Sequence, residues 1–465
     1  MRQWIILGAV ALVTCIAALA AIQIDGLARV GAGYKAKVLC SEVFVAGRDQ
    51  NAVLASDFDG IDPMLEKIGV TVRHKQQRVD ASLLGFGRAR AVYRDGYGCA
   101  LANGSGLAEL PESLPARAVD PWPEAKAASK RPLAGVDYDA LTAALDGAFN
   151  SNDANHRALL VAVDGKIVAE RYAPGFDADT AFLSWSMGKS VIATLVGAAV
   201  LKGYVDVDAP APVAEWKEGD PRAAITWNDL LRMQSGLEFA EDYDDPLSDV
   251  NRMLFAASDA GEVAAKQPLA HAPGDVWAYS SGTTNLVART LRATLKERGI
   301  DLYVFAREAI FDPIGATSFV LETDADGNPI GSSFVYAAAR DWARLGQLYL
   351  QDSVWEGRRI LPEGWTDYVS APTPASDGQY GAHFWLNRDG DGDGNDARKR
   401  FLPGLPESVY FMAGHEGQYV FIIPSKRAVI VRTGMTREGV PIDIVAPLIG
   451  AIYDAVGNPP DAAAP

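Results

Sequence analysis

The chain has 465 residues, of which 49% are hydrophobic and 22% are charged, enough for one large domain with additional segments. Its formal net charge of −16 at pH 7 argues against a nucleic-acid partner, because phosphate backbones are bound by clustered Lys and Arg. The same charge disfavours a general attraction to anionic lipid surfaces.

Residues 4–22 form an uncharged apolar run that follows Arg2. About twenty apolar residues can span a bilayer as a helix, so residues 1–22 are either a signal peptide or an uncleaved membrane anchor, and we favour the anchor. Both interpretations place the rest of the chain outside the cytoplasm, in the periplasm or secreted. A buried helix of a soluble domain is the alternative, and the position at the extreme N-terminus disfavours it.

Two of the three cysteines, Cys40 and Cys99, lie beyond this run, whereas Cys15 lies inside it. An even pair in an exported chain predicts a disulfide between them, with two unpaired buried thiols as the alternative. The surrounding residues 23–115 predict a small accessory region with strand-like alternation but no visible catalytic motif. Residues 116–136, rich in Pro, Ala and Lys, predict a linker.

Residues 137–456 are expected to form the main domain, followed by a flexible tail at 457–465. Asp137 is placed to cap a first helix, and residues 158–172 predict a hairpin that turns at Asp164-Gly165. A mainly helical stretch follows from about residue 190 to 370. Three strands and a helix then close the domain, at residues 408–414, 417–424, 427–434 and 440–456.

Strands near both ends of the domain with helices between them predict an α+β sandwich. In this α/β architecture a single antiparallel sheet is flanked by the N- and C-terminal helices and interrupted by a large all-helical insertion.

Residues 182–200 contain two overlapping motif fragments. Gly188-Lys189-Ser190 has the ending of a phosphate-binding loop, but Leu183 stands where that loop requires Gly, which excludes a nucleotide site. Ser186 and Lys189 are three residues apart, a spacing that puts a nucleophile and its base on one helical face. The apolar residues that follow predict a buried helix, so Lys189 would be partly desolvated, which favours the neutral amine. On this segment alone, a surface lysine at the start of an ordinary core helix is equally compatible.

Two further stretches carry candidate residues. Tyr279 precedes Ser280 and Ser281, and His415 stands two residues before Gly417 at the start of a predicted strand. Together with Ser186-x-x-Lys189, in this order, they resemble the penicillin-recognising serine hydrolases. The resemblance covers residues 137–456 and is to the branch that contains class C β-lactamases, DD-carboxypeptidases, esterases and 6-aminohexanoate-dimer hydrolases.

This resemblance implies that Ser186 forms an acyl-enzyme, with Lys189 as its base. Tyr279 would share the proton and pass one to the leaving group. The backbone N–H groups of Ser186 and Gln418 would form the oxyanion hole, and Gly417 would leave room for substrate along its strand. The implied chemistry needs no metal and no cofactor.

The chain departs from the β-lactamase pattern at two substrate-binding positions. Ser281 stands where lactamases carry Asn, and His415 stands where many carry Lys, a stronger anion site than a neutral imidazole. Both changes favour an ester or amide substrate, small or peptide-like, of the esterase or 6-aminohexanoate-dimer-hydrolase type. A DD-carboxypeptidase, a weak β-lactamase, and a silent relative that binds peptidoglycan peptides or a protein are the alternatives.

An acidic loop at residues 389–396 has calcium-loop spacing at Asp389, Asp391 and Asp393. The twelfth position, which should carry a bidentate Glu, is Arg400, so an acidic insertion is favoured over a calcium site. The remaining histidines show no zinc-ligand spacing.

Overall fold

The computed structural model describes residues 2–103, 106–111, 114, 132–151, 154–390 and 399–458. The side chains of residues 2–11, 13 and 16–21 lie outside this description, as do most of the predicted linker at 116–136 and of the predicted tail at 457–465. Within the described part, no helix is both long and apolar enough to cross a bilayer. Because most side chains of residues 4–22 are not described, the membrane anchor there stays a prediction.

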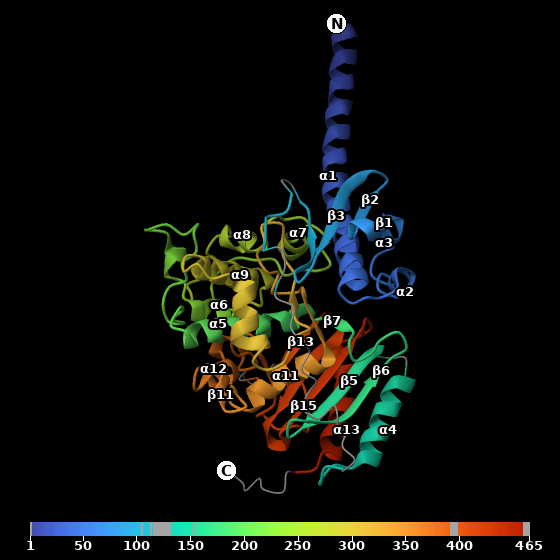
Figure 1. Ribbon diagram of the computed structural model, residues 1–465. Helices are drawn as coiled ribbons and strands as arrows, with labels where there is room; N and C mark the ends of the chain where they lie inside the picture. The colour runs from blue at the N-terminus through green and yellow to red at the C-terminus, as the bar shows by residue number, and fades with distance from the viewer. Residues whose placement is uncertain are drawn as a thin grey trace.

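The accessory region consists of helices laid against a small antiparallel sheet. Helix α1 (Arg2–Phe44) projects from the molecule at its N-terminal end and packs along β3 at its C-terminal end (Figure 1). The remaining elements are α2 (Gln50–Ser56), α3 (Pro63–Lys67) and four strands in sheet order, β1 (Gly69–Arg73), β2 (Arg78–Leu83), β3 (Phe86–Arg94) and β4 (Gly98–Leu101).

The main domain is built on a six-stranded antiparallel sheet whose strands come from both ends of the domain. Its order is β12-β13-β14-β15-β5-β6, so β15 pairs with β5 across almost the whole length of the domain. The strands are β5 (His156–Val163), β6 (Lys166–Tyr172), β12 (Trp385–Leu386), β13 (Tyr410–Gly414), β14 (Gln418–Ile423) and β15 (Ala428–Gly434).

Two helical layers cover this sheet. Helices α4 (Tyr138–Asn150) and α13 (Pro441–Ala455) pack on one face, and α11 (Ala339–Leu350) packs on the other (Figure 1). Successive strand residues point to opposite faces, so Leu160 joins the core beneath the helical insertion and Val161 joins the core beneath α4 and α13. Asp137 caps α4 by accepting a hydrogen bond of 2.9 Å from the backbone of Ala140.

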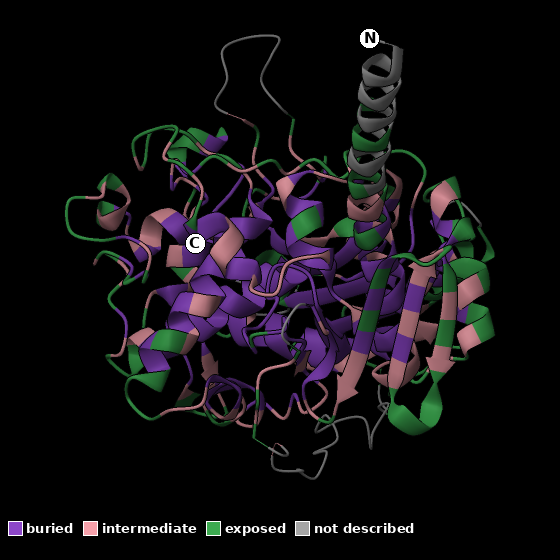
Figure 2. Cartoon of the chain, turned by 90° about the horizontal axis from the view of Figure 1, so that it is seen from above, coloured by how far each residue is buried: buried purple, intermediate pink, exposed green. Residues whose placement is uncertain are grey.

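The insertion between β6 and β12 is mainly helical, with a second, three-stranded sheet in the order β7-β9-β8 that the sequence analysis did not anticipate. Its elements are β7 (Ala181–Leu183), α5 (Gly188–Leu201), α6 (Trp227–Leu231), α7 (Asp249–Phe255), α8 (Ala260–Ala265), α9 (Ser281–Lys296), α10 (Leu302–Ala306), β8 (Val320–Leu321), β9 (Val335–Ala338), α11, β10 (Val354–Trp355), β11 (Arg358–Arg359) and α12 (Trp365–Ser370). Seen from above, buried residues fill the interior between these elements (Figure 2).

The accessory region and the main domain share a hydrophobic core. Residues of α1 such as Val38 and Leu39 pack in one cluster with Phe255 and Phe334 of the main domain. At Gly33 the helix approaches the end of α7 so closely that a Cβ atom would stand 2.1 Å from the carbonyl oxygen of Phe255.

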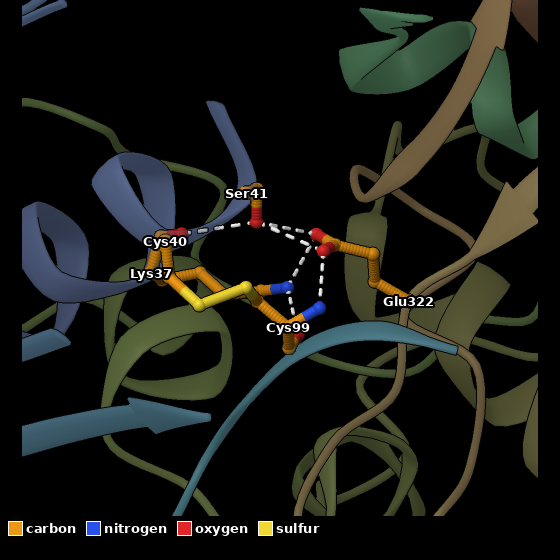
Figure 3. Close-up of a disulfide and its surroundings, with 5 residues drawn as sticks. All are labelled: Lys37, Cys40, Ser41, Cys99 and Glu322. Carbon is orange, nitrogen blue, oxygen red and sulfur yellow. Dashed lines mark hydrogen bonds and ion pairs between the residues drawn. A yellow bond between two sulfur atoms is a disulfide. The ribbon is translucent and has the colours of Figure 1, made fainter. Parts of the chain in front are cut away.

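Polar contacts join the two parts at the same place. Lys37 forms a fully buried ion pair of 2.5 Å with Glu322, whose carboxylate also accepts hydrogen bonds from the hydroxyl of Ser41 and the backbone N–H of Cys99 (Figure 3). Cys40 and Cys99 are joined in a disulfide, the pairing that the sequence analysis expects. The disulfide thus ties α1 to β4 beside the buried ion pair.

Because the Lys37–Glu322 pair is buried, removing one partner leaves an unpaired charge in the interior. We expect Glu322→Gln to lower the free energy of unfolding by about 3–5 kcal/mol, measured by denaturant titration of the full chain. The double variant Lys37→Met/Glu322→Leu removes both charges and should recover most of this loss.

The matched control is Glu262→Gln, which breaks the exposed pair with Lys266 and should cost about 0.5 kcal/mol or less. Equal effects of Glu322→Gln and Glu262→Gln would contradict the structural role of the buried pair.

Candidate active site

Ser186 lies in a single helical turn, η3 (Trp185–Met187), between β7 and the buried helix α5. Its side chain is half-buried, so it is accessible from outside. Trp185 immediately before it has a φ of 44°, a left-handed conformation that is costly for a bulky residue and that the surrounding structure must hold in place. The serine is therefore presented on a constrained turn that opens a helix.

Lys189 is directed at Ser186 from the first turn of α5. It is only 1% exposed, and its Nζ donates to Oγ of Ser186 at 3.0 Å, to Oγ of Ser281 at 2.9 Å and to the carbonyl of Ser332 at 3.2 Å. Burial lowers the pKa of Lys189 to about 8, and the negative charge of Glu241 opposes this shift. An amine with this pKa can accept a proton near neutral pH.

Tyr279 completes the group. Its ring lies 4.7 Å from Nζ of Lys189, measured to the ring centroid, and its side chain hydrogen-bonds with Ser186. Burial raises the pKa of Tyr279 above its ordinary value, and the hydrogen bond with Ser186 partly offsets this rise. At a pH at which Lys189 loses its proton, the phenol of Tyr279 therefore keeps its own. The structure brings together all three predicted catalytic residues.

Glu241 belongs to the same network and was not singled out from the sequence. Ser281, at the start of α9, is fully buried and donates its hydroxyl to Glu241 at 2.5 Å and its backbone N–H to the same carboxylate at 2.8 Å. The same hydroxyl accepts from Lys189, so Ser281 bridges the amine and the carboxylate. Glu241 also accepts a hydrogen bond from Tyr243 at 2.8 Å. Ser281 is thus occupied inside the network, where the sequence analysis expected a substrate contact.

The predicted substrate strand lies beside the serine, since β13 and the start of β14 pack against η3. Gln418 is fixed by its side chain, which donates to the carbonyl of Gly434 at 2.6 Å and accepts from its N–H at 3.1 Å. Gly417 has a φ of 83°, and a Cβ there would stand 2.4 Å from the guanidinium of Arg432. His415 is exposed, with its ring against those of Trp185 and Tyr243. The oxyanion hole at the N–H groups of Ser186 and Gln418 stays a prediction.

Only the first two residues of the predicted acidic loop at 389–396 lie within the described part of the chain. Asp391, Asp393 and Gly394 of the predicted calcium-loop pattern are outside the described residues. Asp389 accepts hydrogen bonds from the backbone N–H and from Nε of Arg400, at 3.0 and 3.1 Å. The residue that replaces the calcium-binding Glu therefore pairs with the first aspartate of the pattern.

The β-lactamase family model matches residues 149–443, which include all the residues of this network. The chain belongs to the β-lactamase family. Among curated relatives of this β-lactamase-family chain, a 6-aminohexanoate-dimer hydrolase from Paenarthrobacter ureafaciens is 29% identical over 234 residues. That match covers 46% of this chain and 57% of the relative, so it spans just over half of the relative's length.

Solved structures show the same fold. A Bacillus anthracis protein provisionally described as a 6-aminohexanoate-dimer hydrolase has a TM-score of 0.54 at 22% identity, covering 66% of this chain and 80% of its own. A family VIII carboxylesterase has a TM-score of 0.51 at 16% identity, and the match covers 69% of this chain and 97% of the carboxylesterase chain. The family and the fold expected from the sequence are therefore confirmed, and these relatives are named as hydrolases.

Because the Glu241 carboxylate raises the pKa of Lys189, neutralising it should lower that pKa. We expect Glu241→Gln to move the titration midpoint of Lys189 from about 8 to a lower pH, measured from the chemical shift of its side chain by NMR.

Glu238→Gln is the control, since it removes an exposed carboxylate three residues earlier in the chain and should leave the midpoint in place. A midpoint that is unchanged or raised in Glu241→Gln would show that the carboxylate does not act on the amine.

Proposed function

We propose that this chain is a serine hydrolase that cleaves an ester or amide bond through an acyl-enzyme on Ser186. The observation that carries the proposal is the 3.0 Å contact between the hydroxyl of Ser186 and a buried amine, Lys189, whose pKa is lowered to about 8. A serine hydroxyl is a weak nucleophile until a neighbouring base can take its proton, and this amine is placed to do so.

In the proposed mechanism, neutral Lys189 takes the proton of Ser186 while Oγ attacks the substrate carbonyl carbon. The backbone N–H groups of Ser186 and Gln418 would stabilise the oxyanion that forms. As the bond to the leaving group breaks, Tyr279 donates a proton to it and recovers one from Lys189. Water then attacks the acyl-enzyme by the reverse sequence of proton transfers, which releases the acid and restores the serine.

The substrate belongs to the esterase or 6-aminohexanoate-dimer-hydrolase type in this proposal. Ser281, at the position where lactamases carry Asn, is held by Lys189 and Glu241, which supports a role inside the proton network. His415 supplies no permanent positive charge for a substrate carboxylate. The relatives named above as 6-aminohexanoate-dimer hydrolase and carboxylesterase support the same choice.

We also propose that the chain works outside the cytoplasm. The disulfide between Cys40 and Cys99 supports this, because such bonds persist in oxidising compartments and are rare in reducing ones. The uncharged run at residues 4–22 is compatible with an export signal.

Removal of the Ser186 hydroxyl should abolish covalent catalysis. With p-nitrophenyl acetate and the full-length protein, we expect Ser186→Ala to lower kcat at least 10³-fold, because the acyl-enzyme can no longer form. Ser408→Ala, at an exposed serine, is the matched control and should leave kcat unchanged.

In the wild-type protein, a fluorophosphonate probe should add its mass to the peptide that contains Ser186. Normal turnover by Ser186→Ala, or a wild-type protein that neither hydrolyses esters or amides nor reacts with the probe, would contradict the proposal.

The pH dependence follows from the state of Lys189, which acts as a base only when neutral. With a pKa of about 8, roughly a tenth of the amine is neutral at pH 7 and half at pH 8. We expect kcat/KM for the ester to rise through pH 8 and to level off above it, after subtraction of the rate with Ser186→Ala. A profile that is flat from pH 6 to 9, or that falls as the pH rises, would exclude neutral Lys189 as the base.

A further inference from the structure

The cavity at Ser186 has walls from both parts of the molecule. Its volume is about 460 Å³, within the range of small-molecule sites. The main domain contributes Ser186 itself with Trp185 and His415, whereas the accessory region contributes residues of α1 and of the segment around α3. The accessory region, in which the sequence shows no motif, therefore borders the nucleophile.

The accessory wall is mainly apolar. Leu27 and Val30 face the cavity from α1, Met64 and Leu65 face it from α3, and Phe255 of the main domain continues the same surface. Apolar surface of this kind gains free energy when an apolar group displaces water from it. A chain attached to the substrate carbonyl would lie against this wall while the carbonyl is at Ser186.

Two of the polar side chains that line the cavity, Arg437 and Asn251, already have partners in the protein. The guanidinium of Arg437 is bound to the carboxylate of Glu416 at 2.8 Å and to the carbonyl of Asp57 at 2.6 Å. The side-chain N–H groups of Asn251 donate to backbone carbonyls, among them that of Asp245 at 2.9 Å. These two side chains therefore have few N–H donors left to bind a polar or anionic substrate chain.

The charge at the cavity rim also disfavours an anionic substrate. Asp62 and Asp244 are both exposed there. Their negative charge would repel a carboxylate at the end of a substrate chain.

The wall is held in place by contacts on both sides. The Nζ of Lys35, on α1, donates to the carbonyls of Leu65 and Ile68 at 2.6 and 3.1 Å, which fixes the segment around α3 onto the helix. The Lys37–Glu322 pair and the contact of Gly33 with Phe255 fix the same helix onto the main domain. The subsite is therefore formed before substrate arrives, which lowers the entropic cost of binding.

We infer that the accessory region forms a subsite for an apolar chain without a negative charge, on the acyl side of the scissile bond. This inference rests on the proposed function, since it names the substrate class of the same site. It assigns to residues 27–68 a direct part in substrate choice.

The test compares p-nitrophenyl esters on the full-length protein. The wild type should hydrolyse the octanoate with a kcat/KM at least tenfold above that for the acetate. The eight-carbon ester that ends in a carboxylate, the mono-suberate, should fall at least tenfold below the octanoate. This wild-type comparison needs no variant and so does not depend on a variant that folds.

Two substitutions that fill the subsite should reduce the preference for the longer chain. Leu27→Trp on α1 and Met64→Trp on α3 should each lower the octanoate-to-acetate ratio of kcat/KM at least tenfold. Ile24→Trp is the matched control, because Ile24 is an exposed apolar residue of the same helix that does not line the cavity. It should leave the ratio unchanged.

The outcomes separate this inference from the proposed function. Acetate turnover without a preference for the octanoate, or a ratio unaltered in both Trp variants, would overturn the subsite and leave the serine hydrolase intact. A wild-type protein that hydrolyses no ester or amide and forms no adduct at Ser186 would remove the proposed function, and the subsite with it.

Discussion

A lysine amine buried beside a serine hydroxyl is the interaction on which the rest of the site depends. Taking an ammonium out of water is costly, and Lys189 meets this cost with three hydrogen-bond acceptors and a lowered pKa. The hydroxyl of Ser281 lies between this amine and the carboxylate of Glu241, because it accepts from Lys189 and donates to Glu241. A direct ion pair would hold the amine in its charged form, whereas this spacing stabilises the charge only partly and leaves the neutral base accessible.

Water is excluded from the amine of Lys189 by the packing of several elements of the fold. Helix α5 is buried along almost its whole length, and its residues pack in the largest core cluster. Trp185, next to Ser186, packs instead in the cluster that α1 and Phe334 build together. The left-handed turn that presents Ser186 is thus held by the core shared with the accessory region. The accessory region supports the turn that carries Ser186 as well as bordering the cavity.

Local patterns predicted what depends on local sequence. The Ser186–Lys189 spacing, the cap at Asp137 and the hairpin turn at Asp164-Gly165 each follow from a few neighbouring residues. Glu241 could not be found in this way, because it lies among several acidic residues in one loop and only the folded chain selects it. The Lys37–Glu322 pair joins positions 285 residues apart, and the apolar side chains of α1 that face the cavity look like any core residues. The length of α1 and the sheet of β7, β8 and β9 were also missed, because both depend on contacts between segments that lie far apart in the sequence.

The accessory wall can influence Ser186 and Lys189 through the water in the cavity between them. Ser186 is half-buried, so solvent reaches its hydroxyl from the cavity that the accessory wall borders. An apolar chain seated on that wall would exclude water from the same space and further disfavour the charged form of Lys189. Substrate binding and activation of the base would then share one physical cause. A chain that ends in a carboxylate would bring its own hydration into the cavity and lose this advantage.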